Sequence, residues 1–307
     1  LQLEIIKATM AGQDVLALMP TGGGKSLCYQ IPGLAKEGLC LVISPLIALM
    51  NDQVQNLRKR SITAFAIHSG LSRKEVVNIL KTATHSNCKF LYVSPERLET
   101  SLFQEYLPAL DVNLIVVDEA HCISQWGYDF RPPYLNIADI REELAEIPVM
   151  ALTASATERV QQDICEKLSL DKNNFKIFRQ SFERPNLSYS VFNIHSRINK
   201  IIQILNNVQG SSIIYCKTRK RTKEVAELLQ MQNISADYYN AGLSSDLRTK
   251  KQQDWIQNKT RAMVCTNAFG MGIDKPDVRS VIHADVPDCL ENYYQEAGRA
   301  GRDGKRA

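Results

Sequence analysis

The sequence predicts an α/β protein with two tandem domains, each a mainly parallel sheet flanked by helices. Three observations favour this fold class. The chain has 307 residues, which is more than a domain with a single hydrophobic core usually contains and is a typical length for two domains. Short runs rich in Val, Ile and Leu alternate with helical patterns, which is typical of buried parallel strands. Hydrophobic residues make up 44% of the chain and charged residues 23%, which argues against a disordered protein.

Two series of apolar runs predict two sheets. The first series predicts strands at 15–18, 39–43, 64–67, 90–93, 114–117 and 149–152. The second predicts strands at 189–192, 212–215, 236–239, 262–265 and 280–283. The predicted helices occupy 25–31, 46–59, 73–84, 158–168, 197–207, 222–232, 245–257 and 290–297. The Pro-containing break at residues 184–186 separates the two series, so the predicted domains are 1–183 and 184–307.

The charge distribution says little about partners. The net charge of +4 is small, but residues 181–307 hold 19 basic and 13 acidic side chains, against 18 and 20 in residues 1–180. The second half is therefore favoured for contact with a polyanion, although a solvated basic face explains the excess equally well. The longest apolar stretch, 39–50, is interrupted by Ser44 and Pro45 and is shorter than the roughly 20 residues that span a bilayer. No membrane segment is expected.

The eight cysteines contain no C-x-x-C pair, and most of them lie in apolar runs. This pattern predicts reduced, buried cysteines in an intracellular protein without a zinc site. Cys122 directly follows His121, but two ligands are too few for a metal site. We therefore interpret Cys122 as a packing residue.

The strongest local signal is the stretch from Met19 to Ser26, which follows an apolar run and precedes a helical pattern. Its glycines let successive backbone N–H groups turn toward an anion, and the following helix N-terminus favours negative charge. The stretch predicts a phosphate-binding loop for ATP, although Met19 stands where the usual pattern has Gly, and a simple Gly-rich turn is the alternative. The residues expected to bind ATP there are Thr21, Gly22, Gly23, Gly24, Lys25 and Ser26.

An acidic pair, Asp118 and Glu119, follows the apolar run at 114–117. Ligands of open α/β sheets bind at the carboxyl ends of the strands. Hydrolysis of ATP requires a metal anchor and a group that orients or deprotonates water. Asp118 suits Mg²⁺ together with Ser26, and Glu119 suits the water. Alone, such a pair is more often a helix cap, but the phosphate loop favours the catalytic interpretation.

Residues 118–132 read D-E-A-H-C-I-S-Q-W-G-Y-D-F-R-P. This stretch resembles the DEAH box and the aromatic-rich loop that marks the RecQ family of superfamily-two DNA helicases. Similar motifs extend from Gln2 to Gly304 and cover nearly the whole chain. The resemblance implies two RecA-like domains of the P-loop NTPase type with ATP and Mg²⁺ in the cleft between them. It also implies 3′→5′ translocation on single-stranded DNA and duplex unwinding in recombination and repair.

The resemblance also assigns residues around the nucleotide. Gln2 would read adenine, and Gly272 and Asp274 would add contacts from the second domain. Arg299 and Arg302 resemble arginine fingers, whose guanidinium groups stabilise charge on the γ-phosphate. If their segment is helical, a spacing of three places both on one face. Because these arginines follow the domain boundary, the catalytic set would be complete only when the domains close. A basic surface turn is the alternative.

The expected DNA contacts are spread over both domains. Aromatic side chains stack bases at about 1–3 kcal/mol each, whereas hydroxyl and amide groups contact phosphates without reading sequence. For the aromatic-rich loop, a small aromatic cluster is the structural alternative. The family more often has Thr at position 155 and His at position 240. The residues assigned to DNA contact or coupling are Ser44, Pro45, Ser94, Arg97, Gln125, Trp126, Phe130, Arg131, Thr153, Ser155, Thr266 and Asn267.

The expected partners are single-stranded and 3′-tailed duplex DNA, with no membrane association and a monomeric state favoured. The expected location is the cytoplasm, with the nucleoid, in a bacterium and the nucleus in a eukaryote. The alternatives are a DNA-stimulated ATPase or translocase that unwinds poorly, an ATP-dependent nucleic-acid-binding module, and an RNA helicase. The zinc-binding and winged-helix regions usual in the family have no counterpart here, so we expect a helicase core taken from a longer protein.

Overall fold

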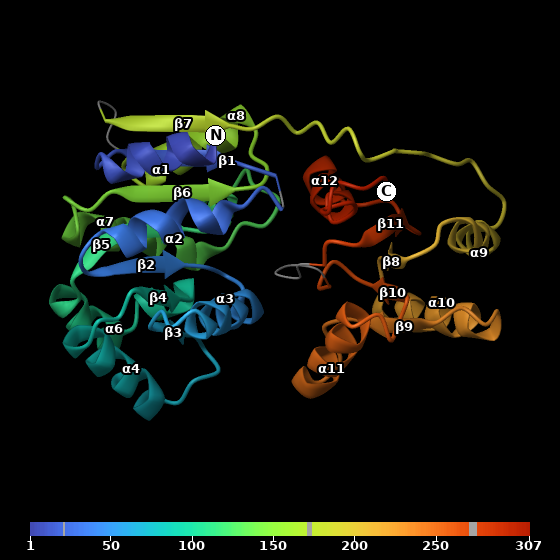
Figure 1. Cartoon of the computed structure of the whole chain (residues 1–307), viewed down its shortest axis with the longest axis horizontal. Coiled ribbons are helices and arrows are strands. Elements are labelled where there is room, and N and C mark those ends of the chain that lie inside the picture. Colours follow the sequence, from blue (N-terminus) through green and yellow to red (C-terminus); the bar gives the residue numbers. More distant parts are fainter. Residues whose placement is uncertain (21, 171–173, 270–274) are drawn as a thin grey trace. The chain divides into compact units, whose positions relative to one another are not determined.

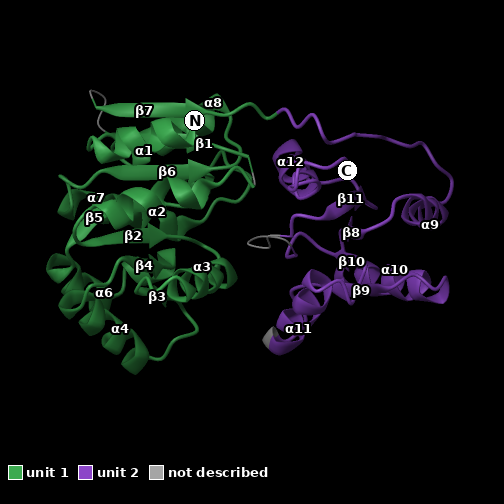
Figure 2. Ribbon diagram, in the orientation of Figure 1, with its two compact units in different colours: residues 1–182 green, residues 183–307 purple. Residues whose placement is uncertain are grey.

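A computed structural model describes residues 1–20, 22–170, 174–269 and 275–307. The chain forms two compact units, Leu1–Phe182 and Glu183–Ala307 (Figure 2). Each unit contains a parallel sheet flanked by helices, which agrees with the predicted α/β class (Figure 1). Within the described ranges, none of the helices combines the length and apolar character required to span a bilayer.

The first unit has a seven-stranded sheet in the order β3-β4-β2-β5-β6-β1-β7. All of its paired strands are parallel, so their carboxyl ends meet at one edge. The edge strand β7 was not predicted, because its side chains are only partly buried and its apolar run is short. The strands are β1 (Asp14–Leu18), β2 (Leu39–Ile43), β3 (Ala64–Ile67), β4 (Phe90–Val93), β5 (Val112–Val117), β6 (Val149–Thr153) and β7 (Phe175–Arg179).

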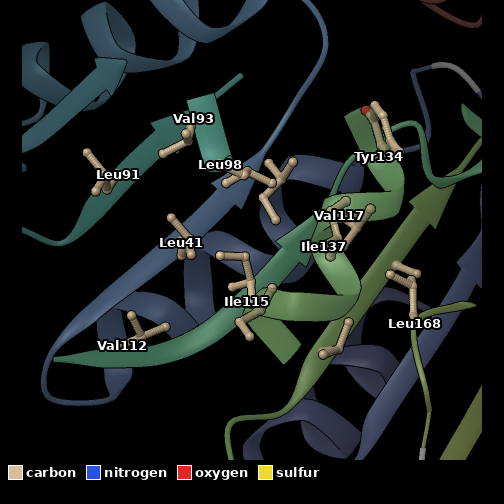
Figure 3. Close-up of a cluster of buried hydrophobic side chains, with 14 of the residues drawn as sticks. Leu41, Leu91, Val93, Leu98, Val112, Ile115, Val117, Tyr134, Ile137 and Leu168 are labelled. Carbon is tan, nitrogen blue, oxygen red and sulfur yellow. The ribbon is translucent and has the colours of Figure 1, made fainter. Parts of the chain in front are cut away.

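Helices cover both faces of this sheet because alternate strand residues point to opposite sides. Val15 and Ala17 pack under α1 (Gln2–Met10), α2 (Lys25–Ala35) and α3 (Ile47–Lys59). Leu16 and Leu18 belong to the other face, whose core is drawn in Figure 3. The helices that contribute to that second core are α4 (Arg73–His85), α5 (Pro95–Leu98), α6 (Ser101–Tyr106), α7 (Ile137–Glu143) and α8 (Glu158–Lys167).

The second unit has four parallel strands in the order β11-β8-β10-β9. One face packs against α9 (Arg197–Asn207) and α10 (Arg219–Met231), and Trp255 of α11 (Ser245–Ile256) fills the core on the other. A last helix, α12 (Leu290–Ala297), contacts β11. The strands are β8 (Ser211–Tyr215), β9 (Ala236–Tyr239), β10 (Ala262–Cys265) and β11 (Val278–His283).

The predicted strand at 189–192 is wrong. Tyr189, Val191 and Phe192 are 51%, 97% and 49% exposed, and the described chain places no strand beside them. The nearest backbone pairing is just before them, where Ser188 N donates to Ala307 O at 2.9 Å. An apolar run becomes a strand only when a neighbouring strand supplies its hydrogen bonds, and this segment lacks that ladder.

Candidate nucleotide-binding and coupling site

Predicted functional residues follow five strands of the first unit at the same sheet edge. The phosphate loop follows β1, Ser44 follows β2, Ser94 follows β4, Asp118 follows β5 and Thr153 ends β6. Parallel pairing fixes this convergence, because all carboxyl ends lie together. Two of these side chains are in contact, because the Ser44 Oγ donates to Asp118 Oδ2 at 3.3 Å.

The phosphate loop depends on glycine backbone geometry. Gly22 and Gly24 have φ angles of +81° and +77°, in the left-handed region, and α2 begins at Lys25 directly after Gly24. Gln2 Nε2 donates to Gly23 O at 2.8 Å, so the predicted adenine reader contacts the loop itself. A Cβ at Gly24 would lie 2.1 Å from Gln2 Nε2. Thr21 lies outside the described residues.

Gly24→Ala is expected to weaken ATP binding at least tenfold and to lower the free energy of unfolding by about 1–2 kcal/mol, the cost of a left-handed alanine. The new Cβ would also displace Gln2 from the loop. A fluorescent-nucleotide titration and thermal unfolding measure the two effects. Gly12→Ala is the matched control, because Gly12 has the same φ of +77° but a Cβ there would meet no atom within 4 Å. Unchanged ATP affinity in Gly24→Ala would contradict this account.

The acidic pair is fixed by the core beneath it. Val117 and Tyr134 belong to the buried cluster in Figure 3, and the Tyr134 hydroxyl donates to Asp118 O at 2.8 Å. The carboxylate of Asp118 accepts from Glu119 N at 3.0 Å. Glu119 has φ +49° and ψ +46°, a left-handed conformation that is costly for a residue with a Cβ. This turn places two carboxylates at the end of one strand.

The environment of Asp118 fits a divalent cation. Burial and the adjacent Glu119 carboxylate raise the pKa of Asp118 above its ordinary value, and the Lys25 ammonium opposes this shift. Crowded carboxylates gain most from a small hard cation, and Mg²⁺ prefers carboxylate, hydroxyl and phosphate oxygens. Asp118 and the Ser26 hydroxyl at the start of α2 would therefore hold Mg²⁺.

Without divalent cations, Asp118→Asn is expected to raise the free energy of unfolding by about 1–2 kcal/mol at pH 7.5. A raised folded-state pKa means that ionisation costs stability, and this cost develops as pH rises from the ordinary pKa near 4 to the raised value. The gain should therefore disappear near pH 4. Thermal unfolding across pH in EDTA tests this, with exposed Asp139→Asn as the control. A destabilised Asp118→Asn protein at pH 7.5 would refute it.

His121 connects the acids to the end of β6. The residue is 1% exposed, and its Nδ1 lies 2.9 Å from Thr153 Oγ1 and 3.4 Å from Glu119 Oε2. The Thr153 hydroxyl donates to Ser155 O at 3.1 Å, so its oxygen accepts from the His121 Nδ1–H. Burial lowers the pKa of His121 and favours the neutral ring. The sequence predicted a role for Thr153 but not this partner.

The aromatic-rich loop contacts His121 directly. The Tyr128 ring stacks on the imidazole with centroids 4.4 Å apart and an interplanar angle of 18°. Trp126 is 59% exposed, and the Arg159 guanidinium lies 3.3 Å from the centroid of its ring. Gln125 is also exposed. The loop therefore combines an exposed aromatic surface with a ring that touches the acidic site.

The other end of the loop is held by ion pairs and backbone contacts. Arg131 pairs with Asp129 Oδ2 through two nitrogens, at 2.9 and 3.1 Å, and its third nitrogen donates to Pro45 O at 3.4 Å. The Lys167 ammonium lies 5.9 Å from the centroid of Phe130 and donates to Ile123 O at 3.1 Å. Arg131 thus links two predicted DNA-contacting segments.

The other predicted DNA contacts of the first unit differ in their surroundings. Arg97 donates to the carbonyl oxygens of His68 and Leu71, at 3.0 to 3.2 Å. Ser94 Oγ and Ser155 Oγ are buried, and neither has a hydrogen-bond partner among the described residues. The Arg97 guanidinium therefore fixes the loop between β3 and α4.

In the second unit, Thr266 and Asn267 line a cavity of about 80 Å³ at the carboxyl ends of β8 and β10. The same cavity is lined by Lys217 and by the pair His283–Glu296, whose Nε2 and Oε2 atoms are 2.8 Å apart. Hydroxyl and amide groups suit contact with a phosphate backbone, whereas Asp285 and Asp288 also line this cavity and the Lys217 ammonium lies 3.0 Å from Asp288 Oδ1. Gly272 and Asp274 lie outside the described residues.

The two candidate arginine fingers follow α12. The helix ends at Ala297, and Arg299 and Arg302 lie in the turns that follow it, so the condition for placing both on one helical face is not met. Gly301, with φ +58°, turns the chain between them. Arg299 is buried, and its guanidinium opposes the rise that burial causes in the pKa of Tyr215.

Sequence reasoning missed Arg159, Lys167 and Tyr134. Arg159 and Lys167 lie on α8, more than 30 residues after the loop segments that they contact, so no local spacing marks them. The available signal was weak: a basic residue soon after the Thr153–Ser155 segment, at the start of a predicted helix.

Comparisons with known proteins agree with this geometry. The model of the DEAD/DEAH box helicase family matches residues 1–164, and that of the helicase conserved C-terminal domain matches 196–304. The probable ATP-dependent DNA helicase RecS of Bacillus subtilis is 45% identical over 99% of this chain and 62% of its own length. The ATP-dependent DNA helicase RecQ of the same organism is 45% identical over 96% of this chain and 50% of its own length.

The fold has a close solved counterpart. The Mycobacterium smegmatis helicase Lhr, solved with single-stranded DNA and AMP-PNP, superposes with a TM-score of 0.78 at 21% identity, over 98% of this chain and 44% of that chain. The chain thus spans between half and about three fifths of the two Bacillus relatives. By its motifs, its fold and the two family models, the chain belongs to the DEAD/DEAH box helicases, and its two units are similar in sequence to the RecS and RecQ helicases of Bacillus subtilis.

Proposed function

We propose that the two units form the motor of an ATP-dependent DNA helicase, which moves 3′→5′ on single-stranded DNA and unwinds 3′-tailed duplexes in recombination and repair. The observation that carries the proposal is the pair of contacts from Tyr128 to His121 and from His121 to Glu119. Tyr128 lies two residues after the exposed Trp126, so the loop that offers a surface suited to base stacking is two side-chain contacts from the catalytic acid.

ATP hydrolysis follows from the residues of the first unit. Lys25 and the loop N–H groups bind the phosphates, and Glu119 orients a water and accepts its proton as the oxygen attacks the γ-phosphorus. The bond from that phosphorus to the bridging oxygen breaks, which yields ADP and phosphate. Asp118 and Ser26 would hold Mg²⁺, which would supply positive charge against the phosphates when bound. Arg299 and Arg302 stabilise the transferred group when the second unit closes on the first, so ATP binding would favour a closed state.

DNA would act on this centre through the aromatic-rich loop. A base stacked on Trp126 competes with Arg159 for the same ring face, and the displaced guanidinium can pair with a phosphate. Movement of the loop changes the Tyr128–His121 stack and hence the neighbour of Glu119. Pro45, Thr266 and Asn267 would contact the strand backbone without reading its sequence, and the buried Ser44 and Ser94 would reach it only after a local rearrangement.

The test compares ATP hydrolysis with and without single-stranded DNA, and unwinding of 3′-tailed and 5′-tailed duplexes. We expect strong stimulation by DNA, loss of stimulation at high salt and a preference for the 3′ tail. Lys25→Ala is the negative control. Hydrolysis that DNA does not stimulate would refute the motor, and stimulated hydrolysis without unwinding would favour a translocase. Stronger stimulation by RNA would favour an RNA helicase.

A further inference from the structure

Three side chains of types that can bind a metal converge where the DEAH box meets the aromatic-rich loop. Cys122 Sγ lies 3.8 Å from His121 Nε2 and 3.8 Å from Asp129 Oδ2. The ligand atoms of the three residues all lie within 4.8 Å of one another. The sequence showed only the adjacent His121 and Cys122, and the fold of the loop adds the carboxylate.

The cluster of His121, Cys122 and Asp129 has one hydrogen-bond donor fewer than its acceptors require. Since Thr153 Oγ1 accepts from His121 Nδ1–H, the neutral ring presents the lone pair of Nε2 to Cys122. The thiol has one hydrogen for two acceptors, Nε2 and the Asp129 oxygen. If the thiol donates to Asp129, the Nε2 of a residue that is 1% exposed has no donor among the described residues. Buried acceptors in that state favour a cation.

We propose that His121, Cys122 and Asp129 bind a borderline or soft divalent cation, of which zinc and cadmium are the best fit. Neutral imidazole, thiolate and carboxylate are the ligands that zinc takes, and Thr153 would orient the imidazole from its other nitrogen. Binding replaces the thiol hydrogen, which leaves as one proton to solvent, and no electron is transferred. A water supplies the fourth ligand. The Asp129 side chain is 38% exposed, so the cation can enter beside it.

The geometry requires a modest movement of the loop. Tetrahedral zinc at about 2.0–2.3 Å from each ligand brings the ligand atoms to about 3.3–3.5 Å from one another. The two sulfur distances of 3.8 Å need little change, and the remaining gap closes if Asp129 moves toward His121. Arg131 must then exchange its two bonds to Asp129 Oδ2 for the other carboxylate oxygen.

The proposed cation would fasten the loop to the DEAH box. Asp129 belongs to the loop that carries Trp126, whereas His121 contacts Glu119. If the function proposed above is correct, bound zinc would hold the loop in one position and reduce the stimulation of hydrolysis by DNA. Binding itself does not depend on that function.

Cadmium binding tests the site directly, because a thiolate–cadmium bond has its own ultraviolet charge-transfer absorbance. We expect one equivalent bound by the EDTA-treated, dialysed protein, and loss of this absorbance in Cys122→Ser. Asp129→Asn should weaken binding by at least about 10–100-fold, the usual effect of losing even an outer-shell partner of a metal site. Cys165→Ser and Cys289→Ser are the matched controls, because these are the two cysteines that are not fully buried. Equal binding by Cys122→Ser or by Asp129→Asn would overturn the proposal.

Trp126 offers a second measurement that needs neither ATP nor DNA. The chain has two tryptophans, and Trp255 is 1% exposed in the second unit. In a Trp255→Phe background, zinc and cadmium should each change the emission of Trp126, cadmium with the affinity found by absorbance, and Cys122→Ser should abolish both changes. Thermal unfolding confirms that each variant is folded. If Cys122→Ser does not fold, the partly exposed Asp129→Asn still decides the matter. An emission of Trp126 that zinc leaves unchanged would refute a clamp on the loop.

Discussion

Glu119→Gln is expected to reduce the DNA-stimulated kcat for ATP hydrolysis by about 10²–10⁴, the usual contribution of a positioned general base. The amide keeps the size of the side chain and can still orient water, but it cannot accept a proton. Binding of ATP should remain within a few-fold of the native affinity, because Lys25 and the loop N–H groups are intact. Single-turnover hydrolysis and a nucleotide titration separate the two effects.

The matched control for this variant is Glu146→Gln, an exposed acid of the same unit that is far along the chain from the DEAH box. It should hydrolyse ATP at the native rate. If Glu119→Gln hydrolysed ATP at the native rate, Glu119 would not be the general base, and another group would have to orient the water.

Arg299→Lys should produce an effect of similar size from the other unit. The lysine keeps the positive charge but loses the planar fork that matches phosphate oxygens. An arginine finger contributes about 10³–10⁵ to kcat, so we expect a fall of at least about 10² with a much smaller change in ATP affinity. The residue lies in a unit separate from the phosphate loop, which is why binding and turnover should separate.

Arg299 is buried, so its replacement can also affect folding. Thermal unfolding of Arg299→Lys addresses this point, and Arg197→Lys is the control, because Arg197 is an exposed arginine of the same unit paired with Asp285. A folded Arg299→Lys protein with full DNA-stimulated turnover would show that the charge of this residue is sufficient or that Arg302 is the finger.

Strand positions in the first unit were predictable because a buried parallel strand is apolar on both faces, as in 114–117. Edge strand β7 was not, since only part of its surface is buried. Short helices such as α6 and α7 span fewer than three turns, so their period is not visible in the sequence. The exposed run at 189–192 has the composition of a strand but no ladder partner, which composition alone cannot reveal.

The sequence predicted the local motifs of the site but did not predict the contacts between residues that are far apart in the chain. The phosphate loop and the acidic pair are set by consecutive residues. The bond from His121 to Thr153 joins residues 32 apart, and Arg159 meets Trp126 over a similar separation. Such pairs depend on which strands are neighbours and on where α8 begins, and both are properties of the assembled sheet.

The parallel sheet has a practical consequence for measurement. Because the predicted functional loops of the first unit gather at the carboxyl edge, the turns at the opposite edge lie at the other end of the strands. Glu37, exposed in the turn between α2 and β2, is one such position. A fluorophore attached there can report the distance to a second label on the other unit during each round of ATP binding. A fluorophore at this edge should leave ATP hydrolysis unchanged while it reports on the movement of the two units.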